Sequence, residues 1–204
     1  MKAREWSSYL ERQRRVYGKR LFTITELANA AGASSDGFYV ELSRLRDYGI
    51  IQRYARGIYG LPGIDSPEIL LAQLDPRAYI TGSYGLYLHN LISQVPVQII
   101  AFTDRRHGRS RIRRTPAGTF RFVTVSPPVY RPPEQGLVAP AAQALYDYYY
   151  ISRKEGVDPK TRVSFRGLDR IPPGRIEELA SSYPRTVGRK IREELELQTE
   201  TPQR

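Results

Sequence analysis

The feature that most constrains the fold is residues 34–63, where a helical pattern runs directly into a hairpin pattern. Phe38, Leu42 and Leu45 are spaced i, i+4 and i+7, which predicts a helix with one buried face, and Gly49 ends it. Two short runs of β-branched and aromatic residues follow, joined by an Arg-Gly turn, and this is a hairpin signature.

Two further helices are expected ahead of this stretch. In the first, one helical stripe that is largely apolar contains Trp6, Tyr9, Leu10, Gln13, Val16 and Tyr17. Thr23 and Glu26 form a capping box that starts the second, and Gly32 ends it. Ser34 or Ser35 is then expected to cap the third helix.

Helix, short strand, helix, turn, helix and hairpin is the element order of a winged helix-turn-helix. We expect this domain over residues 1–62. A second, mixed α/β domain over residues 63–204 is expected to end in helices, which makes the fold class α+β. Pro62 and Gly63 punctuate the boundary, and Ser66-Pro67-Glu68 has the pattern of a new helix start.

The charge balance points to a polyanionic partner. The chain has 32 Lys plus Arg against 21 Asp plus Glu, a net charge of +11 and a pI of about 10. Compositional bias towards basic residues is the alternative explanation. Without a long apolar run or a secretory leader we expect a cytoplasmic protein with no membrane partner. The absence of cysteine excludes disulfides and thiolate sites.

The third helix is expected to enter the major groove of duplex DNA, with its small N-terminal residues against phosphates and its outer face against base edges. Arg44 is the candidate for a bidentate contact to guanine, and the hairpin tip would reach the backbone or minor groove. The DNA-contacting residues predicted in this domain are Ser34, Ser35, Gly37, Tyr39, Val40, Ser43, Arg44, Arg53 and Arg56.

Each of these residues also has an ordinary interpretation. Arg44 and Arg46 can be solvated helix charges, and a winged helix can serve as a protein docking module. Asp36, Glu41 and Asp47 count against a close approach to phosphate. The conjunction of capped helices, a small-residue turn and a basic hairpin favours DNA.

A second basic feature lies between two β-rich runs at residues 97–103 and 120–125, which we expect to pair as a hairpin around a long polar loop. The loop is predicted to be a phosphate-binding arm that adds affinity without sequence readout. A solvated loop with no partner is the alternative. The arginines concerned are Arg105, Arg106, Arg109, Arg111, Arg113 and Arg114.

The remaining sequence predicts mainly helices. One over residues 83–91 is expected to be capped by Ser83. Another, over 138–156 with Pro140 near its start, carries a tyrosine cluster, and two lie in the tail. The tyrosines are expected to pack in the core, with stacking on single-stranded bases as the alternative.

No enzymatic chemistry is expected. The only histidines are His89 and His107, too few for a histidine-rich metal site, and no cofactor motif occurs, so we predict no catalytic residue, metal or cofactor. Ser83 and Asp104 resemble part of a nucleotidyltransferase site, but the second carboxylate that two-metal chemistry needs is replaced by Arg106.

The stretch "LFTITELANAAGASSDGFYVELSRLRDYGIIQRYARGIYGLPG", followed later by "AYITGSYGLYLHNLISQVP" and "VAPAAQALYDYYY", resembles the AbiEi family of type IV toxin-antitoxin antitoxins over nearly the whole chain. The chain departs from the family at Ala142 and Gln143, where members commonly have a Glu-Lys pair, and it retains Asp147.

The resemblance implies a DNA-binding antitoxin that represses its own promoter at inverted repeats. Its second domain would counteract a nucleotidyltransferase-like toxin encoded beside it, and direct contact with the toxin is not part of what the resemblance implies. The alternative function is an RNA-binding or ribosome-associated adaptor that uses the arginine-rich loop.

Overall fold

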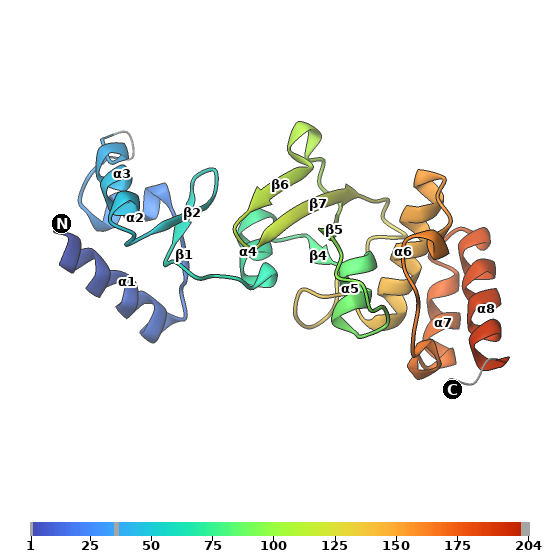
Figure 1. The fold of residues 1–204 in the computed structure, drawn as a ribbon. Helices are drawn as coiled ribbons and strands as arrows, with labels where there is room; N and C mark the ends of the chain where they lie inside the picture. Colours follow the sequence, from blue (N-terminus) through green and yellow to red (C-terminus); the bar gives the residue numbers. More distant parts are fainter. Residues whose placement is uncertain (1, 35–36, 201–204) are drawn as a thin grey trace. The chain divides into compact units, whose positions relative to one another are not determined.

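The computed structural model describes residues 2–34 and 37–200, and it combines helices with two small sheets, the predicted α+β class. The chain groups into two compact units (Figure 1). Unit 1 is Met1–Leu74 with Arg114–Ala117, and unit 2 is Asp75–Arg113 with Gly118–Arg204. The predicted boundary between residues 62 and 63 falls earlier, because the helix that follows it groups with unit 1.

Unit 1 contains four helices and a three-stranded antiparallel sheet of order β1-β3-β2. The first six elements follow one another in the predicted order. The elements are α1 (Ala3–Tyr17), β1 (Leu21–Thr23), α2 (Ile24–Ala30), α3 (Tyr39–Asp47), β2 (Gln52–Ala55), β3 (Ile58–Gly60) and α4 (Pro67–Leu74).

The core of unit 1 forms between α1, α2, α3 and the sheet. Trp6 and Leu10 of α1 are fully buried, and the Trp6 ring centroid lies 5.6 Å from that of Phe38. The predicted stripe is wrong at its C-terminal end, because Val16 and Tyr17 are 56% and 65% exposed. The last turn of α1 extends past the core and has no apolar surface to cover.

The helix starts in unit 1 follow local hydrogen bonding. The capping box at α2 is confirmed: Thr23 Oγ1 accepts from the Glu26 N–H at 3.2 Å, and the Glu26 carboxylate accepts from the Thr23 N–H at 2.8 Å. The predicted start of α3 is wrong, because the helix begins only at Tyr39. Ser34 Oγ instead accepts from the Gly37 N–H at 3.2 Å in a turn before the helix. Glycine costs a helix about 1 kcal/mol relative to alanine, which favours the later start.

The hairpin of unit 1 turns at Arg56 and Gly57. Gly57 has φ +75°, a conformation that glycine adopts at little cost. The pairing register shifts between Arg53 and Ala55, and the Arg53 Nε–H donates to the Ala55 carbonyl at 3.3 Å. This irregularity increases the local twist of β2.

Unit 2 is built on a four-stranded sheet of order β4-β5-β7-β6, and the strands are β4 (Tyr79–Ile80), β5 (Gln98–Thr103), β6 (Ile112–Thr115) and β7 (Gly118–Thr124). The last two residues of β6, Arg114 and Thr115, group with unit 1. Strands β5 and β7 are parallel, so the predicted hairpin between them is wrong. Alternation of apolar residues shows which side chains of a strand lie on the same face of the sheet, but it does not show whether two strands run parallel or antiparallel. Strand β6 was missed because its sequence, Ile-Arg-Arg-Thr, is dominated by arginine.

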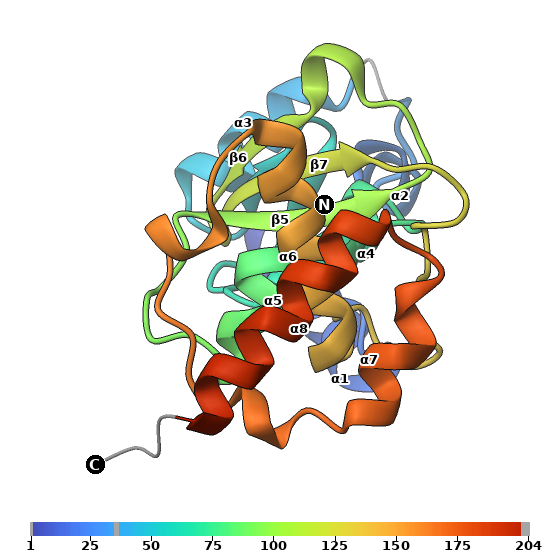
Figure 2. The same cartoon turned by 90° about the vertical axis from the view of Figure 1, so that its right-hand side faces the viewer.

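Helices cover the sheet of unit 2, and α6 contacts α5, α7 and α8 (Figure 2). The predicted tyrosine helix is confirmed: Pro140 is the N-cap of α6, and Tyr146, Tyr148, Tyr149 and Tyr150 are at most 8% exposed. The tyrosines therefore pack in the core. The helical elements are α5 (Gly82–Leu88), α6 (Ala141–Glu155), α7 (Pro173–Ala180) and α8 (Arg185–Glu200), with short 3₁₀ turns η1 (Gly108–Ser110), η2 (Pro159–Thr161) and η3 (Leu168–Arg170).

The predicted cap of α5 is wrong. Thr81 occupies the N-cap position, and its hydroxyl donates to Asp147 Oδ2 at 2.6 Å. Ser83 lies one position inside the helix and makes no cap.

Over residues 2–34 and 37–200, no helix is both long and apolar enough to cross a bilayer.

Candidate nucleic-acid interface

The outer face of α3 carries the predicted base-reading side chains. Tyr39 and Val40 are 58% and 63% exposed, and Ser43 and Arg44 are also exposed, on the side of the helix away from the buried Leu42. Side chains at this level of exposure can be reached by a partner.

One of the acids expected to oppose phosphate is engaged inside unit 1. Glu41 is partly buried, and its Oε1 accepts a hydrogen bond from Trp6 Nε1–H at 3.2 Å. Asp47 is exposed, and Asp36 lies outside the described residues. Within α3, Glu41 therefore faces the core, and Asp47 is exposed at the C-terminal end of the helix.

A cavity of about 420 Å³ joins α3 to the β2–β3 hairpin. Its arginines are Arg46, Arg53 and Arg56, and no carboxylate lies among its lining residues. Tyr39 and Ser43 also line it, whereas Val40 and Arg44 are exposed outside it. Of the predicted residues, Tyr39 and Ser43 of the helix thus share one concave basic surface with Arg53 and Arg56 of the hairpin.

Arg46 is a member of this surface that the sequence prediction omitted. It follows Ser43 by three positions and Tyr39 by seven, which places all three on one face of α3. That spacing could have identified it.

The small residues ahead of α3 match the predicted contact with DNA phosphates only in part. Ser34 and Gly37 are exposed, but the Gly37 N–H already donates to Ser34 Oγ. The prediction for Ser35 lies outside the described residues. The turn thus presents small side chains but not the Gly37 amide.

In unit 2 the arginine-rich segment is folded and is not a long loop, because η1 and β6 occupy much of it. Arg113 differs from the rest in being partly buried, with its guanidinium 5.1 Å above the Phe122 ring. The predicted phosphate-binding arginines that are exposed are Arg105, Arg106, Arg109 and Arg111, together with Arg114, which groups with unit 1.

A buried carboxylate holds this segment in place. Asp75 is fully buried, and its Oδ2 accepts from Thr103 Oγ1 at 2.7 Å and contacts His107 Nε2 at 2.8 Å. Its Oδ1 accepts from the Arg77 N–H at 3.0 Å and lies 3.7 Å from Arg105 Nη1. Burial alone would raise the pKa of Asp75, but the bonds from His107, Thr103 and Arg77 outweigh it and lower the pKa.

His107 links Asp75 to Arg113. Arg113 Nη2 lies 3.1 Å from His107 Nδ1, and because arginine only donates, Nδ1 accepts and Nε2–H donates to Asp75. The imidazole also stacks on Phe122, with ring centroids 4.2 Å apart. This chain of contacts ties the segment to the sheet.

The segment also lines a second basic cavity, of about 360 Å³. Arg106, Arg111 and Arg121 contribute to it together with His107, and none of its lining residues is a carboxylate. Guanidinium groups around a concave surface suit phosphate or carboxylate oxygens.

Asp75 was missed by the sequence prediction. The signal available was local: aspartate before proline favours a turn in which its side chain accepts a backbone N–H two residues on, as Asp75 does with Arg77. Nothing in the sequence indicated its link to His107, thirty-two positions later.

The structure brings Tyr39, Ser43, Arg53 and Arg56 together in unit 1, and Arg106 and Arg111 together in unit 2. Arg113 is partly buried and Ser35 lies outside the described residues. The other predicted contacts are exposed: Ser34, Gly37, Val40, Arg44, Arg105, Arg109 and Arg114. No known protein family matches the chain, and a search of curated proteins finds no match.

Proposed function

We propose that unit 1 is a winged helix-turn-helix that binds duplex DNA, with α3 in the major groove and the β2–β3 hairpin on the adjacent backbone. The observation that carries this proposal is the cavity between α3 and the hairpin, where three arginines meet without a carboxylate. Arg46, Arg53 and Arg56 would neutralise phosphates there, and the exposed Arg44 would read guanine.

The arginines of unit 2 support the same function in a different role. Arg105, Arg106, Arg109 and Arg111 are exposed on a segment held by Asp75, so they would contact phosphates without reading sequence. Their contribution is affinity common to all duplexes.

We further propose that the protein represses its own promoter in the cytoplasm and acts as an antitoxin towards a nucleotidyltransferase-like toxin. This part rests on the family resemblance alone. Co-expression tests it directly: a toxin encoded by the neighbouring reading frame is expected to arrest growth unless this chain is present.

The DNA-binding proposal is tested by measuring affinity for three nucleic acids at several salt concentrations. They are the gene's own upstream duplex, a scrambled duplex of the same composition and a structured RNA. The upstream duplex is expected to bind at least about 10³-fold more tightly than the scrambled one. With about six to eight phosphate contacts, log affinity is expected to fall against log salt with a slope of roughly −5 to −7.

Two substitutions separate base reading from phosphate binding. Arg44→Ala is expected to reduce preference for the upstream duplex, whereas Arg109→Ala weakens both duplexes equally. Arg153→Ala, an exposed arginine of α6, is the matched control. If log affinity falls against log salt with a slope near −1, the arginine segment does not contact the DNA backbone. Tighter binding of RNA than of either duplex would favour the RNA-adaptor function instead.

A further inference from the structure

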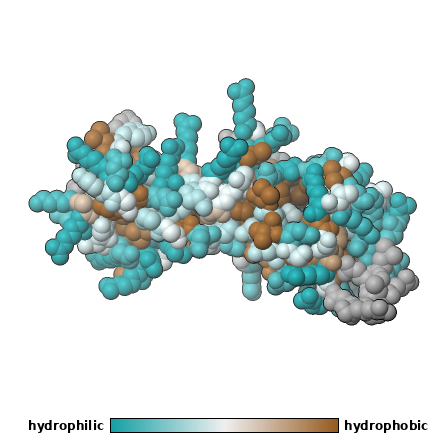
Figure 3. Space-filling model, in the orientation of Figure 1, coloured by the Kyte–Doolittle hydropathy of each residue, from teal (hydrophilic) through white to brown (hydrophobic). Residues whose placement is uncertain are grey.

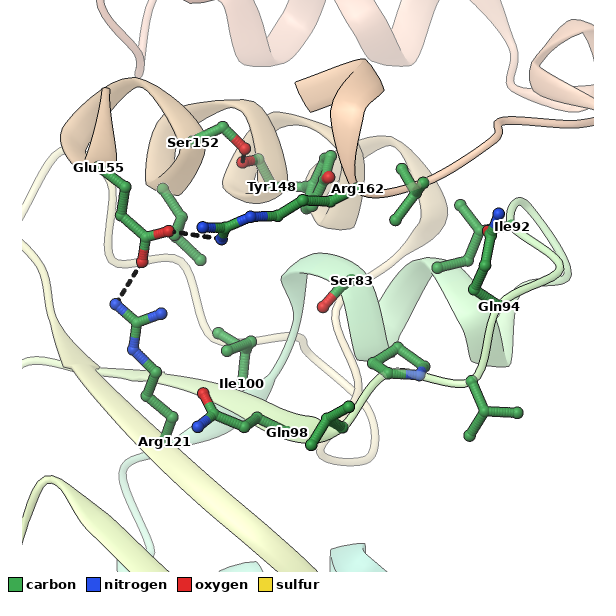
Figure 4. A pocket seen from close by; sticks show the side chains of 15 residues that line it. Ser83, Ile92, Gln94, Gln98, Ile100, Arg121, Tyr148, Ser152, Glu155 and Arg162 are labelled. Atoms are coloured by element: carbon green, nitrogen blue, oxygen red, sulfur yellow. Dashed lines mark hydrogen bonds and ion pairs between the residues drawn. The ribbon is translucent and has the colours of Figure 1, made fainter. Parts of the chain in front are cut away.

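Unit 2 contains a cavity that the proposed DNA binding does not use. It lies between β5, β7, α5 and α6 and has a volume of about 350 Å³ (Figure 4). Cavities that hold small molecules in proteins start at about 300 Å³. It is large enough for one small organic molecule.

One wall of the cavity is apolar. Ile92, Ile100 and Ile151 come from three separate segments, and each is at most 8% exposed although it lines the cavity. The exposed Val95 and Val97 stand among the lining residues as well, and Figure 3 shows hydrophobic side chains gathered on the visible face of unit 2. A ligand with an apolar body would gain free energy by covering this wall.

Two polar side chains on the cavity have hydrogen-bonding capacity to spare. Across the described parts of the chain, neither Ser83 Oγ nor the Gln98 amide has a hydrogen-bond partner, and Figure 4 shows the Ser83 hydroxyl directed into the cavity. Two other lining groups are satisfied by the fold: Tyr148 OH donates to the Pro159 carbonyl at 2.8 Å, and Ser152 Oγ donates to the Tyr148 carbonyl at 2.9 Å. Both groups are only partly buried, so they can exchange solvent for hydrogen bonds to a ligand.

A group of three charges forms the other wall. Glu155 Oε1 lies 2.5 Å from Arg121 Nη2, and Glu155 Oε2 accepts from Arg162 Nη1 at 2.8 Å (Figure 4). Burial opposes ionisation of Glu155, but the two guanidinium groups outweigh it and lower its pKa. Two cations against one anion leave one positive charge, and each guanidinium keeps further N–H donors.

We propose that this cavity binds a small organic anion. Its apolar body would lie on Ile92, Ile100 and Ile151, its carboxylate or phosphate group would meet Arg121 and Arg162, and its polar edge would bond to Ser83 and Gln98. The proposal is separate from DNA binding, because none of the residues proposed to contact DNA lines this cavity, although Arg121 also lines the neighbouring basic cavity.

The test uses two matched pairs of probes on the full chain: indole-3-acetate with neutral indole-3-acetamide, and adenosine 5′-monophosphate with adenosine. Saturation-transfer NMR detects binding, and amide shifts in the labelled protein locate it. The anion of at least one pair is expected to bind, shifting the amides of Ser83, Gln98 and Ile100, and to bind at least tenfold more tightly than its neutral partner. Binding of indole-3-acetate would indicate a carboxylate ligand, and binding of adenosine 5′-monophosphate would indicate a phosphate ligand.

Substitutions fix the location. Arg162→Gln removes a cation that is 56% exposed and is expected to weaken the anion about tenfold or more, while Arg153→Gln, on α6 outside the cavity, leaves it unchanged. Ser83→Ala is expected to cost about threefold to tenfold. The proposal is overturned if neither anion binds, if the neutral partners bind equally well, or if the shifts lie elsewhere and Arg162→Gln has no effect.

Discussion

The two basic surfaces hold their arginines by different means. In unit 1, Arg44 and Arg46 project from a regular helix whose opposite face is buried, so an ordinary apolar core fixes their position. In unit 2, the arginines around His107 are positioned by a buried carboxylate and the hydrogen bonds it accepts. The surface on α3 should therefore tolerate changes to its own arginines, whereas the surface around His107 depends on one buried residue, Asp75.

The largest effect is expected from removing that group. Asp75→Ala leaves the donors of Thr103, His107 and the Arg77 backbone unpaired, which should lower the free energy of unfolding by about 3–5 kcal/mol. Urea denaturation at pH 7, followed by circular dichroism, measures it. Asp65→Ala, an exposed carboxylate of unit 1, is the control. A loss below about 1 kcal/mol would show that Asp75 does not anchor the segment.

Asp147 is a second buried carboxylate, and it can be compared with Asp75 because its own hydrogen bonds come from neutral hydroxyl groups. Asp147 accepts from Thr81 Oγ1 and Tyr183 OH, each at 2.6 Å, but burial raises its pKa from 3.8 to about 7. The folded state then keeps a proton that the unfolded chain loses above pH 3.8. The free energy of unfolding should therefore fall as pH rises from 3.8 to about 7, by roughly 4 kcal/mol, and stay level above that range.

Asp147→Asn is expected to flatten this part of the pH profile, because the amide cannot ionise. Urea denaturation of both proteins at pH 4 to 8 measures the difference. Asp75 makes the opposite contribution: its pKa is lowered, so its stabilisation is present above its ordinary pKa of 3.8 and is lost as pH falls through the lower folded value. An unchanged slope in Asp147→Asn would mean that Asp147 is ionised in the fold.

A smaller effect is expected at His107. His107→Ala removes a hydrogen bond to Asp75 and the stack on Phe122, and should cost about 1–2 kcal/mol. Amide hydrogen exchange should accelerate at residues 105–111 and stay unchanged in α3. Equal acceleration in both regions would contradict the local role given to this imidazole.

The smallest effect is expected on DNA affinity from one arginine of unit 1. Arg46→Ala removes a phosphate contact beside Arg53 and Arg56 and should weaken upstream and scrambled duplexes alike by about 1 kcal/mol. The slope of log affinity against log salt should become shallower by about 1. A selective loss for the upstream duplex would instead make Arg46 a base-reading residue.

Features that depend on residues close together in the chain were predicted from the sequence. The Thr23–Glu26 capping box, the end of α3 near Gly49 and the start of α6 at Pro140 are each set within a few positions, and all three are found. The buried face of α3 follows from the spacing of Leu42 and Leu45.

What the sequence did not reveal depends on partners distant in the chain. The parallel pairing of Ile100 with Arg121 follows from the path of the segment between them, and the bond between Asp75 and His107 spans thirty-two positions. Ser83 was assigned a capping role because a serine near a helix start usually has one, yet Thr81 is the N-cap. Local patterns carry no information on these contacts.

The chain has one tryptophan, and Trp6 is fully buried in unit 1, where its indole N–H bonds to Glu41. Tryptophan fluorescence therefore reports the melting of unit 1 alone, whereas near-ultraviolet dichroism combines Trp6 with tyrosines of both units, such as Tyr54 and Tyr59 of unit 1 and those packed along α6. The natural sequence thus carries an optical signal of its own for unit 1, and the melting of that unit can be followed within the full chain without a label.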